Sequence, residues 1–180
     1  MAQNYSDIEH FDSSIVDGLN IAKRHSNAMI GLNDWVEREH GGQCSKFCDV
    51  KVLDIDRVVN DCKLNNVSSS DTVIGLRNGN NRSLRLVEAK FGVKKHNARE
   101  LGATTLKDKY DGSTKLIREL GDVDIMISKK MDILVKKGMV EILRSRLQNL
   151  TARNRSIHFV AKDIDSFYAE YFVEKKYNNK

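Results

Sequence analysis

The sequence predicts an α/β protein in which a mixed β-sheet is flanked by helices. Two observations predict this class. Three strand-like segments follow one another between residues 47 and 91, which favours an antiparallel meander. Helix-like and strand-like segments then alternate from residue 97 onward, which favours crossovers onto the same sheet. The chain has 180 residues, a length suited to one core, so we expect residues 1–180 to form a single domain.

The first long segment, 7–39, is expected to be helical. Its apolar residues recur near helical spacing from Ile15 to Val36. The polar run 25–27 could divide the segment into two helices, and the glycine pair at 41–42 is a strong stop signal.

Three strands are expected next. Segment 47–59 is rich in β-branched residues, 71–78 is a second β-rich run, and 83–91 is the clearest alternating strand in the chain. The sequence Asn-Gly-Asn-Asn at 78–81 lies between the second and third strands, and Asn and Gly tolerate the positive φ of tight turns. We therefore expect the second and third strands to form a β-hairpin.

The rest of the chain is expected to alternate between helix and strand. Segment 97–119 indicates a helix, 122–128 a short buried strand, and 131–152 a long helix with one apolar face. Segment 156–162 indicates another strand, and 166–176 fits either a strand or a helix.

Glu88 and Lys90 lie on an otherwise apolar face of the clearest strand. Side chains alternate across a strand, so both residues share the face of Leu84 and Leu86. Moving a carboxylate and an ammonium group from water to a buried face costs free energy. Such a cost is typical of charges that are paired or functional.

The hairpin brings Asp71 to the same face. A two-residue turn at 79–80 puts Asp71 directly across from Glu88, another even turn keeps it on that face, and a three-residue turn would direct it away. Opposed Cβ atoms are about 5 Å apart, and two carboxylates so close repel each other unless a cation lies between them. Their oxygens suit Mg²⁺ or Mn²⁺. Asp71 and Glu88 could then hold a metal for phosphate hydrolysis, with Lys90 beside the attacking water.

An Asp on one hairpin strand and Glu-x-Lys on the next, behind an N-terminal helix, resemble the PD-(D/E)XK nuclease superfamily. The resemblance covers residues 7–128 and implies the restriction-endonuclease-like fold, a mixed sheet with an αβββαβ core. It implies that Asp71 and Glu88 bind Mg²⁺ (or Mn²⁺) and that Lys90 assists the attacking water. The implied activity is that of a metal-dependent nuclease, most readily a DNA endonuclease.

Two further features follow from the resemblance. Many members add a glutamate from the first helix, for which Glu37 and Glu39 are the candidates, whereas Ser70 stands where the loosely kept motif often has proline. Single-domain members often act as dimers. The aromatic side chains of the last segment could form a homodimer interface or complete the core: Phe167, Tyr168, Tyr171 and Phe172.

The charge distribution favours a polyanionic partner. The formal net charge is +5 and the sequence pI is about 9.1. Cations cluster between residues 77 and 99, where Glu88 is the only acid. We expect Arg82, Lys94, Lys95 and Arg99 to bind nucleic acid, DNA more readily than RNA, by neutralising phosphates. A solvated basic surface would have the same composition.

Asp54 and Asp56 offer an alternative to Asp71. They share one face of the expected strand 47–59 and could hold the metal if the strand order differs. A second alternative concerns activity, because a non-catalytic protein with the same fold would bind nucleic acid or a protein partner within a larger complex.

The cysteines and the N-terminus favour a cytoplasmic protein. Cys44, Cys48 and Cys62 are an odd number, which does not favour a disulfide scaffold. Together with His40 they have the ligand types of a zinc site but not its usual spacing. No basic segment followed by an apolar one begins the chain, and no apolar run approaches the roughly 20 residues of a membrane helix.

Overall fold

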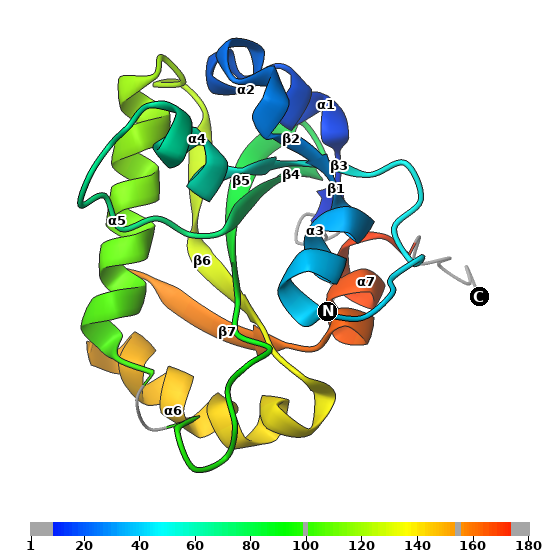
Figure 1. Cartoon of the computed structure of the whole chain (residues 1–180), viewed down its shortest axis with the longest axis vertical. Coiled ribbons are helices and arrows are strands. Elements are labelled where there is room, and N and C mark those ends of the chain that lie inside the picture. Colours follow the sequence, from blue (N-terminus) through cyan, green and yellow to red (C-terminus); the bar gives the residue numbers. More distant parts are fainter. Residues whose placement is uncertain (1–8, 99–100, 154–155, 174–180) are drawn as a thin grey trace, which may run out of the picture.

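The residues that the computed structural model describes, 9–98, 101–153 and 156–173, form a seven-stranded mixed β-sheet with helices on both faces (Figure 1). The strands are β1 (His10–Phe11), β2 (Met29–Gly31), β3 (Lys51–Asp54), β4 (Thr72–Asn78), β5 (Asn81–Ala89), β6 (Met126–Leu134) and β7 (His158–Lys162). Their order is β2-β3-β4-β5-β6-β7, and β1 pairs with β4 outside this path.

The direction of pairing changes at β5. Strands β2 to β5 are antiparallel, whereas β5, β6 and β7 are parallel and are connected through crossover helices. An antiparallel meander followed by parallel crossovers is the arrangement that the sequence predicts, so the α/β class and the mixed sheet are confirmed.

Helices cover the two faces unequally (Figure 1). One face carries α1 (Ser13–Asp17), α2 (Asn20–Arg24), α4 (Ile55–Asp61), α5 (Ala103–Glu119) and α6 (Val140–Arg153), which is preceded by the 3-10 turn η4 (Lys137–Met139). The other face carries α3 (Leu32–His40) and α7 (Ile164–Tyr171), while the short 3-10 turn η2 (Ser26–Ala28) leads into β2. Among the described helices, none has the length and apolar character needed to cross a membrane.

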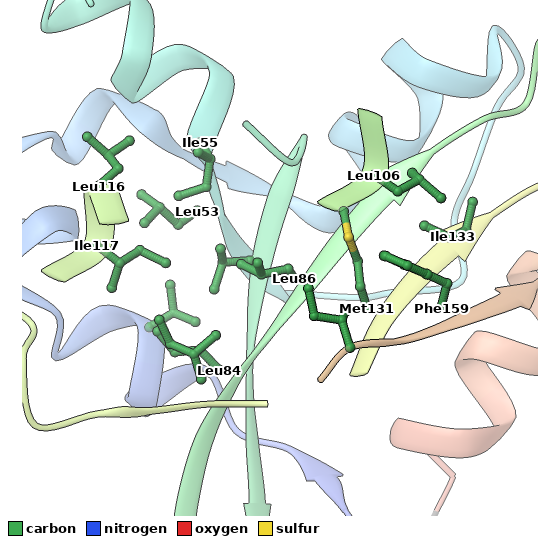
Figure 2. Close-up of a cluster of buried hydrophobic side chains, with 14 of the residues drawn as sticks. Leu53, Ile55, Leu84, Leu86, Leu106, Leu116, Ile117, Met131, Ile133 and Phe159 are labelled. Carbon is green, nitrogen blue, oxygen red and sulfur yellow. The ribbon is translucent and has the colours of Figure 1, made fainter. Parts of the chain in front are cut away.

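Apolar side chains on the α5 face form the larger of two core clusters (Figure 2). Leu53, Leu86 and Ile133 come from β3, β5 and β6, and Leu106 and Ile117 reach them from α5. Each such side chain contributes about 1.5–3 kcal/mol when it is removed from water. The packing therefore fixes α5 against the middle of the sheet.

Alternation along β5 decides which face each side chain reaches. Leu84 and Leu86 belong to the cluster under α5, whereas Val87 belongs to the cluster under α3 and α7. Glu88 continues the series of Leu84 and Leu86, so its carboxylate is on the α5 side of the sheet.

The predicted hairpin and its register are confirmed. Asn78 pairs with Asn81 across a two-residue turn, in which Gly79 has a φ of 56°. The same register pairs Thr72 with Val87. Extending it by one residue puts Asp71 across from Glu88, as expected for an even turn.

The expectation of helix throughout 7–39 is wrong in two places. β1 pairs with β4, and β2 pairs with β3 through Met29 and Leu53. Both strands are only two or three residues long, so neither gives a period that differs from the helical pattern around it.

Two further boundaries differ from expectation. The strand expected over 47–59 ends at Asp54, whose side chain accepts a hydrogen bond from the backbone N–H of Arg57 (3.0 Å) and begins α4. Residues 131–134, expected in a helix, belong to β6, where both neighbouring strands pair with them in parallel. Tertiary pairing overrides the local helical period there.

The C-terminal aromatic residues complete the core. The segment is helical, and Phe167 and Tyr171 are buried against the α3 face. Tyr168 and Phe172 are partly buried against the same cluster. These contacts favour the core interpretation over a dimer interface formed by the aromatic side chains.

A close contact between α5 and the loop before β4 positions Asp71. A side chain at Gly112 would lie far inside contact distance of the Ser68 carbonyl oxygen. One residue later, Ser113 Oγ accepts a hydrogen bond from the Ser70 backbone N–H (2.7 Å). The loop can rest on α5 because Gly112 has no Cβ.

Gly112→Ala is expected to destabilise the fold by about 1–3 kcal/mol, because the added methyl group must push the loop away from α5. Urea denaturation would measure the free energy of unfolding. Gly138→Ala is the matched control, since a Cβ there meets nothing within 4 Å. Equal stability of the two variants would contradict the close contact at Gly112.

Candidate functional site

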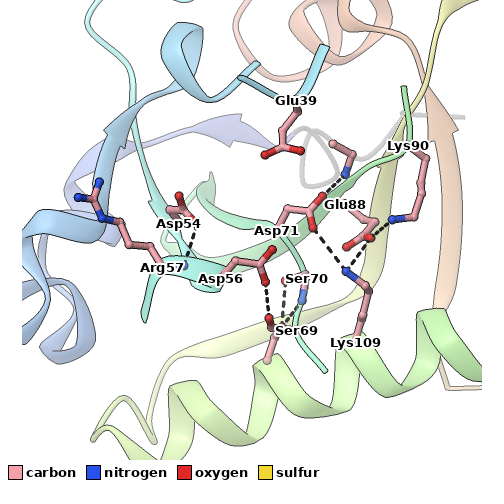
Figure 3. Close-up of polar contacts among 12 residues, drawn as sticks. Glu39, Asp54, Asp56, Arg57, Ser69, Ser70, Asp71, Glu88, Lys90 and Lys109 are labelled. Carbon is pink, nitrogen blue, oxygen red and sulfur yellow. Dashed lines mark hydrogen bonds and ion pairs between the residues drawn. The ribbon is translucent and has the colours of Figure 1, made fainter. Parts of the chain in front are cut away.

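Asp71 and Glu88 lie together at the open end of the β4–β5 hairpin, opposite its turn (Figure 3). Asp71 directly precedes β4, and Glu88 is the penultimate residue of β5. Lys90 follows β5, and Lys109 reaches the same point from the middle of α5. The fold thus brings two carboxylates and two ammonium groups together from three segments.

Each oxygen of the pair has a distinct environment. Asp71 Oδ2 accepts a hydrogen bond from the Ala89 N–H (2.6 Å), and Asp71 Oδ1 lies 3.4 Å from Lys109 Nζ. Glu88 Oε1 lies 2.9 Å from Lys109 Nζ and also pairs with Lys90 Nζ. Glu88 Oε2 is buried and has no hydrogen-bond partner among the described residues.

Burial dominates the electrostatics of Glu88, whose exposed fraction is 0%. Burial, followed by the negative charge of Asp71, raises the pKa of Glu88 to about 7. The positive charges of Lys90 and Lys109 act in the opposite direction and do not overcome it. Burial thus favours the protonated form of this carboxyl group more than in a solvent-exposed glutamate.

Lys109 is the site residue that sequence reasoning missed. Burial by itself would lower its pKa, but the charges of Glu88, Asp71 and Asp56 outweigh burial and raise it. A signal existed in the sequence, because Lys109 falls on the same helical stripe as the buried Leu106 and Ser113. A lysine within a buried stripe indicates a partner across the interface.

Of the two alternative acids, Asp56 is the one whose carboxyl group is influenced by the charge of Asp71. Asp54 caps α4 through Oδ1, and its Oδ2 accepts a hydrogen bond from Arg38 Nη1 (2.5 Å). Both oxygens of its carboxylate therefore already have partners. Asp56, in the first turn of α4, accepts a hydrogen bond from Ser69 Oγ. Burial raises the pKa of Asp56, and the charge of Asp71 adds to the effect although the Ser69 bond opposes it.

The two α3 glutamates have different surroundings. Glu37 Oε1 accepts a hydrogen bond from the Cys44 N–H (2.7 Å), which ties it to the loop after α3. Glu39 pairs with Arg38, and its carboxylate points toward Asp71 in Figure 3. Within the described ranges neither glutamate forms a metal-holding cluster with Asp71 and Glu88.

The residues expected to bind nucleic acid are divided by the fold. Lys94 and Lys95 are exposed on the loop that follows β5. Arg82 pairs with Arg77 beside the hairpin turn, about 20 Å along the strand from Glu88 at 3.3 Å per residue. Arg99 lies outside the described residues.

Two cavities adjoin this end of the sheet. A cavity of about 160 Å³ on the α5 side is lined by Lys90, Asn97, Thr105 and neighbouring apolar residues. A larger cavity of about 450 Å³ on the α3 side is lined in part by Lys46, Lys136 and Lys137. The smaller cavity lies beside Lys90, and the larger one lies beside the residues that follow β6.

The donor set fits a hard divalent cation. Asp71 and Glu88 offer carboxylate oxygens, the ligands that Mg²⁺ and Mn²⁺ prefer. The buried Glu88 Oε2 is an acceptor to which the described residues supply no hydrogen-bond partner. Within the described ranges no three His, Cys, Asp or Glu side chains form a ready-made metal cluster, so solvent or substrate oxygens would complete the shell.

The cysteines do not form the zinc site that their residue types allow. Cys62 lies against the α5-side core, with its Sγ 3.5 Å from His25 Nε2. Cys44 lies against the α3-side core, and Cys48 is exposed. The sheet therefore separates Cys62 from Cys44.

Comparisons with protein families, with curated proteins and with solved structures found no significant match to the chain. What the site can do follows from its own arrangement. Paired carboxylates beside two lysines can hold a cation, orient a water molecule and stabilise negative charge that develops on a phosphate.

Glu88 is expected to make stability depend on pH. Because the folded-state pKa lies above the ordinary 4.5, the group stabilises the fold below pH 4.5, and this contribution is lost as pH rises to about 7. The loss has a ceiling of about 3 kcal/mol. Glu88→Gln should flatten the decline in unfolding free energy between pH 5 and pH 8, measured by urea denaturation.

Glu141→Gln is the control, because Glu141 is an exposed acid of α6 paired with Arg144. Its pH profile should follow that of the wild type. If Glu88→Gln gave the same profile as Glu141→Gln, the raised pKa of Glu88 would be wrong.

Proposed function

We propose that the chain is a metal-dependent nuclease of the restriction-endonuclease-like type, which hydrolyses phosphodiester bonds of nucleic acid, with DNA as the first substrate to test. The observation that carries the proposal is the buried Glu88, which has one unpartnered oxygen and lies beside Asp71 and Lys90. A fold rarely leaves a buried carboxylate so incompletely paired unless a ligand completes it.

The element order supports the resemblance. Helix α3 precedes the antiparallel strands β3, β4 and β5, and α5 then leads to β6, which is parallel to β5. With α4 inserted between β3 and β4, this order is compatible with the αβββαβ core that the PD-(D/E)XK resemblance implies. The acidic residues fall on the elements where the resemblance places them, at the start of β4 and near the end of β5.

The chain's own groups have separate tasks in this proposal. Asp71 and Glu88 would hold Mg²⁺ or Mn²⁺, which when bound polarises the phosphate and lowers the pKa of a water molecule. The Ala89 N–H fixes Asp71 Oδ2, so Oδ1 stays directed toward Lys109 and Glu88. Lys90, whose side chain is 28% exposed, donates from the mouth of the site to the attacking water or to the phosphate.

Substitution of the site residues tests catalysis. Asp71→Ala, Glu88→Ala and Lys90→Ala should each lower cleavage by about 100-fold or more, since each removes a group that acts on the water or the metal. Plasmid, duplex DNA, single-stranded DNA and RNA would be incubated with Mg²⁺ or Mn²⁺. Lys107→Ala, on the exposed side of α5, should leave the rate unchanged. Full activity in Glu88→Ala would remove the proposed site.

A second candidate is a non-catalytic protein of the same fold that binds nucleic acid. The specific observation in its favour is that Lys90 and Lys109 already neutralise the two carboxylates. No cleavage of any of the four substrates, together with binding to one of them, would favour this candidate.

Both candidates require phosphate contacts by Lys94 and Lys95. Replacing both lysines by alanine should weaken oligonucleotide binding in EDTA and lower the salt slope by about 1 for each lysine. Fluorescence anisotropy at several salt concentrations would measure both quantities. Lys115→Ala, remote on α5 and paired with Glu119, is the control. An unchanged slope in the double variant would exclude these lysines from the interface.

A further inference from the structure

Lys109 occupies the position that a cation would take between the paired carboxylates. Its Nζ lies 2.9 Å from Glu88 Oε1 and 3.4 Å from Asp71 Oδ1 (Figure 3). The charge of Asp56 also acts on it from α4. Three acids from different elements thus act on one ammonium group.

The neighbouring lysines of α5 differ from Lys109 both in their partners and in their exposure. Lys107 and Lys115 pair with Asp111 and Glu119, one turn further along the helix. Their side chains are 43% and 74% exposed, whereas that of Lys109 is 20% exposed. Surface pairs within one helix contribute only a few tenths of a kcal/mol. Lys109 instead links α5 to the two strands that carry the site.

We infer that Lys109 is an internal counter-ion, which holds Asp71 and Glu88 together before a divalent cation binds and competes with that cation for their oxygens. The inference rests on the proposed metal site and concerns its regulation. Without Lys109, two buried carboxylates would face each other with Lys90 as the remaining near cation, and their repulsion would oppose folding.

The carboxylates of Asp71 and Glu88 cannot pair fully with the Lys109 ammonium group and with a divalent cation at the same time. A divalent ion held by Asp71 and Glu88 would lie close to the ammonium group that now pairs with Asp71 Oδ1 and Glu88 Oε1, and two positive charges so close repel each other. The ammonium group must therefore withdraw, and its partial exposure leaves room toward solvent for the four-carbon side chain. Metal affinity is reduced by the free energy of breaking these contacts.

The test compares Lys109→Met with Lys107→Met, which removes the same charge from the exposed side of the same helix. Mn²⁺ binding to the full chain would be measured by isothermal titration calorimetry, and melting temperature with EDTA or with Mn²⁺. Lys109→Met should bind Mn²⁺ about tenfold more tightly than the wild type, equivalent to ~1.4 kcal/mol. It should also melt lower in EDTA and recover with Mn²⁺, whereas Lys107→Met should match the wild type.

The outcomes separate this inference from the proposed function. Equal Mn²⁺ affinity in the wild type and Lys109→Met would overturn the competition and leave the metal site standing. No Mn²⁺ binding by either protein would overturn the metal site itself, and the inference with it. If Lys109→Met does not fold in EDTA, Lys109→Gln keeps a hydrogen-bond donor without the charge and should show the same gain in affinity; no gain there would also overturn the competition.

Discussion

The carboxylate of Glu88 lies on a strand face that is otherwise part of the core, and its burial is the constraint around which the site is built. Removing an ionised carboxylate from water costs several kcal/mol unless partners compensate. The compensation comes from Lys90, which directly follows the strand, and from Lys109 on a helix that packs over it. Helix α5 must therefore dock in one register, and the Gly112–Ser68 contact is what permits that register.

The opposite face of the sheet holds a second group of buried charges, and its carboxylate is paired differently from that of Glu88. There Asp132 accepts a hydrogen bond from the Tyr171 hydroxyl through Oδ2, and its Oδ1 lies 2.7 Å from Lys162 Nζ. Arg85 donates to Tyr171 and to Glu9. Both oxygens of that carboxylate have partners, and the group anchors α7 to β5, β6 and β7. Glu88 Oε2 and Asp132 Oδ1 both lack a hydrogen-bond partner among the described residues. Asp132 Oδ1 still has the Lys162 ammonium group as an ion-pair partner, which is why we assign a ligand to Glu88 and a structural role to Asp132.

The sequence was sufficient where local rules decide the outcome. The turn at Gly79-Asn80 has an even number of residues, as the sequence favoured, and any even turn puts Asp71 on the face of Glu88, so their shared face could be predicted from the sequence. It was insufficient where a distant segment decides. β1 and β2 exist only because β4 and β3 offer them edges. Asp54 ends β3 and caps α4, so Asp56 lies in a helix and not on the strand face where it was expected.

The role of Lys109 in the site could not be predicted from the sequence for the same reason. Strand alternation places residues of one hairpin relative to each other, but it does not reveal which helix crosses above them. Lys109 lies 38 residues from Asp71 in sequence, and only the docking of α5 brings the two within ion-pair distance. Acids on a strand can therefore be assigned to a site from sequence, whereas the cation that balances them is found only when the layers are assembled. At Asp71 and Glu88 the Lys109 ammonium group provides that balance, so the docking of α5 sets the electrostatic environment of the carboxylates that the hairpin brings together.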